Sequence, residues 1–118
     1  MKREKRPEIG ATMYSVQEHL YYIPDRASPV REYCVCEAEV RGFFVGGYVE
    51  ICLTGKIPGK GIVPYRYPLK DVGKQVFYTP HEAAVLAKQM TEKYERTWGW
   101  MRDPPMRRTW AHLLEDTE

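Results

Sequence analysis

The chain passes from a strand into a helix within one stretch, Val76-Phe77-Tyr78-Thr79-Pro80-His81-Glu82-Ala83-Ala84. Thr79 can cap the helix N-terminus, Pro80 lacks the N–H that would stay unpaired there, and Glu82 has the spacing of a capping box. We therefore predict a helix from about Pro80 to Arg96. Its apolar residues recur at three- and four-residue steps and form one stripe: Ala83, Leu86, Ala87, Met90, Tyr94 and Trp98.

The residues before this helix show the alternation that is typical of β-strands. Residues 33–40 alternate most clearly, so Glu37 and Glu39 are expected to face water, while Cys34, Cys36, Ala38 and Val40 face the core. Gly42 is expected to mark a bulge or bend. Gly46-Gly47 predicts a two-residue hairpin turn, after which a return strand runs through Leu53.

Three other strands are expected. Residues 18–23 are rich in strand formers, although the capping-box spacing of Ser15 and Glu18 leaves a helix open for part of residues 13–23. Gly55–Gly61 is expected to be a loop. The strand over 62–69 contains two prolines, which predict an edge position. A last short strand is expected over Val76–Thr79.

These patterns predict a single α+β domain over residues 1–118. It consists of a small antiparallel, SH3-like sheet or barrel of about five strands, a C-terminal helix and a Trp-rich tail. Residues 1–12 are expected to be flexible, the alternative being a basic arm, and residues 97–118 form a C-terminal extension. A second short helix is predicted over about 106–115.

Composition excludes several classes of protein. The formal net charge of +2 is too small to indicate nucleic-acid binding by itself. An odd count of three cysteines fits a reducing cytoplasm better than a disulfide framework. The sequence has no apolar run of roughly 18 residues, so no membrane span is expected, and no secretory signal is expected either.

No motif for catalysis stands out, so we do not expect an enzyme, a cofactor or a metal. Cys34 and Cys36 are expected to be structural core residues, because Cys52 should lie on an outward face and does not converge with them. The three histidines are far apart and no nucleophile motif accompanies them. The loop fails the phosphate-loop pattern, since Lys60 stands where the second glycine is required.

The tail offers the best candidate site. Tryptophan and arginine are enriched in protein-interface hot spots, and they also suit stacking on single-stranded nucleic acid. The candidate partner-binding residues are Trp98, Trp100, Arg102, Arg107, Arg108 and Trp110. The alternative is that the tryptophans dock the tail onto the domain. Lys56 and Lys60 are candidate phosphate contacts in a basic loop.

Residues Asp71–Ala84 resemble the end of small uncharacterised proteins from Firmicutes phages and other mobile elements. Those proteins close with a Gly-Lys-x-Val-Phe-x-Thr strand and a helix that begins x-Glu-Glu-Ala, where this chain has His81 before Glu82. The resemblance implies a small barrel-like β domain with a C-terminal helix, encoded on a mobile element, and we expect the protein in the cytoplasm of a bacterial host cell. The resemblance also implies a host protein as partner, with a role such as inhibiting a defence system, as anti-CRISPR proteins do. The alternative is a nucleic-acid-binding protein.

Overall fold

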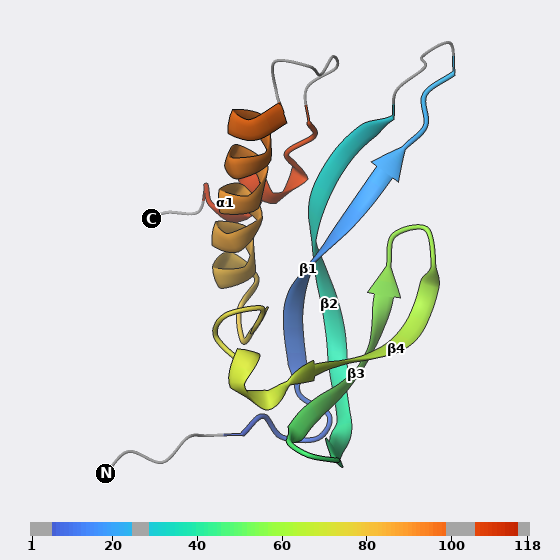
Figure 1. Ribbon diagram of the computed structural model, residues 1–118, viewed down its shortest axis with the longest axis vertical. Helices are drawn as coiled ribbons and strands as arrows, with labels where there is room; N and C mark the ends of the chain where they lie inside the picture. Colours follow the sequence, from blue (N-terminus) through green and yellow to red (C-terminus); the bar gives the residue numbers. More distant parts are fainter. Residues whose placement is uncertain (1–5, 25–28, 99–105, 116–118) are drawn as a thin grey trace.

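The computed structural model describes residues 6–24, 29–98 and 106–115. It contains β1 (Thr12–Tyr21), β2 (Val30–Val45), β3 (Val49–Ile57), β4 (Gly61–Pro68), β5 (Val76–Phe77) and α1 (Pro80–Trp98), with short 3-10 helices η1 (Leu69–Asp71) and η3 (Thr109–Leu113) (Figure 1). The strands form one antiparallel sheet in the order β4-β3-β2-β1-β5. The expected α+β class with five strands is confirmed, and β4 lies at an edge as its prolines predicted.

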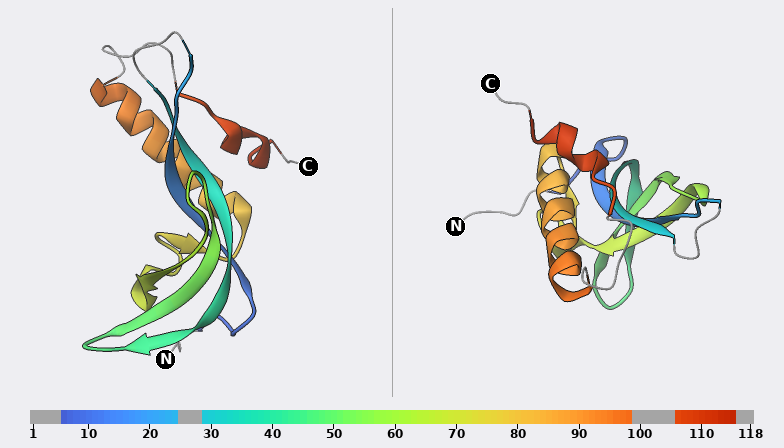
Figure 2. Two further views of the ribbon diagram at one scale, coloured as in Figure 1. Left: turned by 90° about the vertical axis from the view of Figure 1, so that its right-hand side faces the viewer. Right: turned by 90° about the horizontal axis from the view of Figure 1, so that it is seen from above.

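The β1–β2 pair is the centre of the molecule and has a core on each face. Figure 2, in the view from above, shows α1 on one side of this pair and the β3–β4 hairpin on the other. On the hairpin side, the even-numbered residues of β2 face the core, as their alternation predicted. The buried cluster there consists of Met13, Ala38, Val40, Ile51, Leu53 and Val76.

Tyrosine hydroxyls connect β4 to β1, two strands that do not pair through their backbones. The Tyr65 hydroxyl of β4 lies 3.4 Å from Ser15 Oγ of β1, and Gln17 Nε2 donates to Tyr67 Oη at 3.2 Å. These contacts join β4 to β1, which are not neighbours in the sheet. Each buried hydroxyl thereby gains a partner in place of water.

The helix-side core is built from small residues. Ala84 and Ala87 of α1 pack with Trp110 of the tail, against Val16 of β1 and with Tyr33 and Val35 of β2. The predicted stripe is correct at Ala83 and Ala87, which are fully buried, but it omitted Ala84 and Thr91. Thr91 is hidden because its hydroxyl donates to Ala87 O at 2.8 Å within the helix, which removes its need for water.

Several predicted boundaries differ from the observed ones. β1 begins at Thr12 rather than near residue 18, so the helical alternative for residues 13–23 is wrong. The β2–β3 turn is longer than two residues, since Val45 pairs with Val49. The tail forms a 3-10 helix over Thr109–Leu113 instead of a longer helix.

Gly42 marks a bulge, as predicted. The pairing shifts between Val40 and Gly42, so the side chains of β2 change faces at this point. Phe43 therefore packs against the core, whereas Phe44 is exposed. The bulge thus decides which of the two neighbouring phenylalanines is available to another molecule.

The predicted N-cap at the start of α1 is confirmed, with the Glu82 side chain meeting the Thr79 hydroxyl. The Glu82 N–H donates to Thr79 Oγ1 at 3.2 Å, and the Thr79 hydroxyl lies 3.1 Å from Glu82 Oε1. We expect Thr79→Ala to lower the free energy of unfolding by about 1 kcal/mol, because this N–H loses its acceptor. Thr79→Ser keeps the acceptor and should retain most of that stability. Equal urea midpoints for the two variants would show that the cap contributes nothing.

Candidate contact surfaces

The described part of the tail is docked on the domain. The Arg107 N–H donates to Arg31 O at 3.2 Å, which places the tail beside the first half of β2. The Trp110 ring then enters the helix-side core and is only 6% exposed. This burial favours the docking alternative for Trp110 over its expected role in partner binding.

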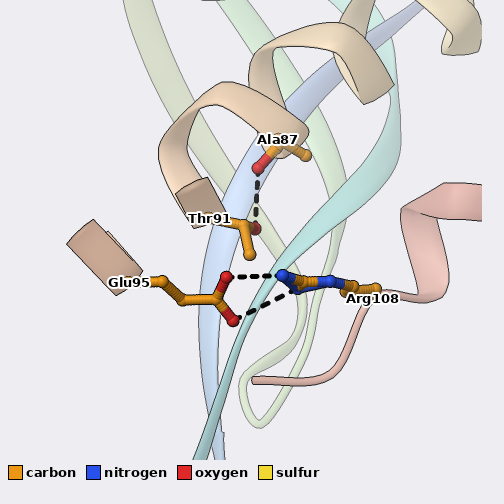
Figure 3. A network of polar contacts seen from close by, with 4 residues as sticks. All are labelled: Ala87, Thr91, Glu95 and Arg108. Atoms are coloured by element: carbon orange, nitrogen blue, oxygen red, sulfur yellow. Dashed lines mark hydrogen bonds and ion pairs between the residues drawn. The ribbon is translucent and has the colours of Figure 1, made fainter. Parts of the chain in front are cut away.

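An ion pair fastens the tail to α1. Figure 3 shows the Arg108 guanidinium facing the Glu95 carboxylate, with two contacts drawn between them, while Thr91 bonds back to Ala87 one turn earlier. The Arg108 Nη1–Glu95 Oε2 distance is 3.2 Å, and Nη2 donates to the other oxygen. Two parallel bonds fix the orientation of the guanidinium relative to the carboxylate and also pair their charges. Arg108 is therefore engaged with Glu95 of α1.

The buried carboxylate of Glu32 in β2 accepts hydrogen bonds from the tail. Glu32 has no exposed surface, and its Oε1 accepts from the Tyr21 hydroxyl at 2.7 Å. Its Oε2 accepts from the Thr109 N–H at 3.0 Å and from the Thr109 hydroxyl. Arg107 lies over the Tyr21 ring, 4.5 Å from its centroid. Sequence reasoning missed Glu32, because Thr109 is 77 positions away along the chain.

The surroundings of Glu32 keep neighbouring groups protonated. Burial and the bond to Glu32 raise the pKa of Tyr21 well above its ordinary value. Burial, then the negative charge of Glu32, raises the pKa of Cys34 to about 12 and that of Cys36 to about 11. A nucleophilic cysteine needs the opposite shift, so these thiols have the character of core residues.

The other expected contact residues are dispersed. Trp98 is 49% exposed at the end of α1, beside a hollow of about 380 Å³ that includes Tyr33 and Met90. Trp100 and Arg102 lie outside the described residues. Lys56 and Lys60 are exposed on the β3–β4 hairpin, where Lys56 belongs to β3 because the loop is shorter than predicted.

A surface that the sequence reasoning did not select lies at the tip of the β2–β3 hairpin. Phe44, Val45 and Tyr48 are 48%, 73% and 60% exposed within five positions of the chain. Arg66 covers one side of the Phe44 ring, with its guanidinium carbon 4.4 Å from the centroid. The available signal was a pair of glycines flanked by large apolar residues. We call Phe44, Val45 and Tyr48 the hairpin tip.

A hollow adjoins the hairpin tip. Its volume is about 560 Å³, and it is lined by Tyr48 and Val49 together with Pro68, Leu69 and Lys70. Tyr48 therefore belongs both to the exposed tip and to a concave, mainly apolar surface. An exposed aromatic beside a hollow is the kind of surface from which interface hot spots are built.

The described residues include no group of three potential metal ligands close enough to share an ion. Within the same residues, no helix has the length and apolar character needed to cross a membrane. Comparisons with protein-family models, with curated proteins and with solved structures gave no match to this chain.

Proposed function

We propose that this protein is a non-enzymatic module that binds another protein through its hairpin tip. The observation that carries the proposal is the exposure of Phe44, Val45 and Tyr48 next to the hollow at Leu69. Burying such side chains against a partner stabilises a complex by about 25 cal/mol per Å² of apolar area removed from water, before the costs of association. The raised thiol pKa values of Cys34 and Cys36 argue against these two cysteines as nucleophiles.

A protein suits this surface better than a nucleic acid does. Trp110 is buried and Arg108 is paired with Glu95, so neither offers a free group for base stacking or phosphate contact. Arg66 lies on the Phe44 ring and is 3.5 Å from Glu50, which leaves Lys70 as the basic residue lining the hollow beside Tyr48. Nucleic-acid binding through Lys56, Lys60 and Trp98 is the competing outcome of the test below.

The nature of the partner rests on the resemblance of Asp71–Ala84 to mobile-element proteins. It leads us to propose a protein of the bacterial host cytoplasm as the target, with inhibition of a defence system as the result. The same proposal includes an SH3-like relationship for the open sheet. Its support is the pair of contacts from Tyr65 and Tyr67 that bring β4 to β1.

The test uses a photo-crosslinking amino acid in place of Tyr48. In a lysate of a bacterial host, we expect this variant to form a discrete protein adduct that nuclease treatment leaves unchanged. The matched control carries the same group at Ile62, which is 74% exposed on the β3–β4 hairpin. Adducts of equal pattern at both positions, or adducts that nuclease removes, would contradict the proposal.

Substitution at the tip should separate binding from folding. Once the partner is identified, Phe44→Ala should weaken binding by about 2 kcal/mol, a typical loss for an aromatic hot spot. Its free energy of unfolding should change little, since Phe44 lies outside the core. Ile62→Ala removes a more exposed apolar side chain elsewhere and should leave the dissociation constant unchanged. Both quantities can be measured on the same samples by calorimetry and urea denaturation.

A further inference from the structure

A groove follows the open edge of β2, away from the hairpin tip. β3 pairs with β2 only from Ala38 onward, and the tail makes its one backbone bond to β2 at Arg31. Between these two points, no strand among the described residues pairs with β2 on this side. A groove of about 870 Å³ lies beside β2, and its lining includes residues 34–39 of this strand.

A glycine stands at the last contact between β3 and β2. A Cβ atom on Gly55 would lie 2.6 Å from Glu37 O and 2.7 Å from the Ala38 Cβ, so only glycine permits this close approach. Immediately afterwards, β3 pairs with β4 alone, through Lys56 and Ile57. Gly55 is thus the last contact before the two strands diverge, and the divergence opens the groove.

The backbone of β2 presents unused hydrogen-bonding groups to this groove. The Val40 N–H donates toward β1, to Ala11 O at 2.9 Å. Successive residues of a strand direct their backbone groups to opposite sides, and the β1–β2 register is unbroken from Val30 to Glu39. Val35, five positions before Val40, therefore directs its N–H and C=O away from β1. This is the arrangement that an added strand requires.

The charge of the groove selects the side chains of such a strand. Glu37 and Glu39 are exposed, lie on the same face of β2 and line the groove. Arg41 is 3.4 Å from Glu39, whereas no described cation lies within ion-pair distance of Glu37. A basic side chain entering the groove would meet the free Glu37 carboxylate. From the β3–β4 hairpin, Pro58 adds an apolar lining and Lys56 a basic one, and Lys56 forms no ion pair with Glu37 among the described residues.

We propose that this groove binds an extended, basic peptide segment of another protein, which pairs with β2 beside Val35 and places a lysine or arginine against Glu37. The open stretch of β2 between Arg31 and Ala38 covers residues 32–37, enough for a strand of about 20 Å at roughly 3.3 Å per residue. The site is independent of the hairpin tip, so either can fail without the other.

The test titrates the full chain with a synthetic peptide, acetyl-Thr-Lys-Val-Lys-Val-Thr-amide, and follows the amide signals by NMR. We expect saturable shifts at Val35 and Glu37, with a dissociation constant of about 1 mM or lower. Glu37→Lys should weaken binding at least about tenfold, which corresponds to 1.4 kcal/mol, without changing the urea midpoint, since this side chain is exposed. Phe44→Ala should bind the peptide like the unmodified chain.

Two control peptides distinguish strand addition from charge attraction alone. Replacing both lysines by glutamates reverses the charge, and N-methylating the central residues removes backbone donors while keeping the charge. Loss of binding in both supports the proposal. Equal binding of the N-methylated peptide, or no saturable shift with the parent peptide, would overturn it. Shifts at Val35 and Glu37 on dilution of the protein alone would also overturn it, because a second copy would then fill the groove.

Discussion

Trp110→Ala is expected to lower the free energy of unfolding by about 4 kcal/mol, the range found for truncating a buried aromatic ring. The ring closes the helix-side core against Ala84 and Ala87, and neither small residue can move to fill the space left behind. A domain of this size has a total stability of only about 5–15 kcal/mol, so the variant should be close to unfolding at room temperature. Urea denaturation followed by circular dichroism measures the loss.

Trp110→Phe is the matched control. The indole Nε1 is buried and has no hydrogen-bond partner among the described residues, so phenylalanine keeps an aromatic ring of smaller size and loses no hydrogen bond. We expect it to cost about 1 kcal/mol. If Trp110→Ala is as stable as the parent chain, the tail does not pack in solution, and a role for Trp110 in partner binding becomes the better explanation.

Glu32→Ala is expected to cost about 3 kcal/mol, because three donors lose an acceptor that is itself fully buried. The donors are the Tyr21 hydroxyl and the N–H and hydroxyl of Thr109. The tail should loosen as a result, so the Thr109 amide should exchange its hydrogen faster than in the parent chain. Native-state hydrogen exchange and urea denaturation report the two effects separately.

Tyr21→Phe tests the same site by removing a single donor and leaving the carboxylate in place. Its cost should be about 1 kcal/mol, with little change at the Thr109 amide. Equal losses for Tyr21→Phe and Glu32→Ala would mean that Glu32 does not hold the tail, and that the Trp110 ring alone accounts for its docking.

Local patterns predicted those parts of the fold that depend on neighbours in sequence. The alternation around Cys34 and Cys36 identified the core face of β2, and the spacing of Thr79 and Glu82 identified the start of α1. Pro64 correctly indicated an edge, since proline cannot donate to a second strand. Each of these features is decided within a few residues.

The features that sequence patterns missed depend on distant partners. Ser15 and Gln17 are polar residues of β1, and tyrosine hydroxyls of β4 contact their side chains from 50 positions away. The buried Glu32 carboxylate finds its partners in Tyr21 and in the distant Thr109. The hairpin tip was missed for a different reason, since the bulge at Gly42 reverses which phenylalanine faces outward. Hydrophobic periodicity along the chain gives no information about contacts between residues that are far apart in sequence.

The docking of Trp110 also bears on how the protein is made. The ring follows the sheet and α1 along the chain, yet it packs between α1 and β2. During synthesis, the sheet and α1 leave the ribosome before this ring is available, so one apolar face stays exposed until the chain has been extended past Trp110. A chain that stops before Trp110 would therefore have an unfinished core and would be a substrate for chaperones and proteases.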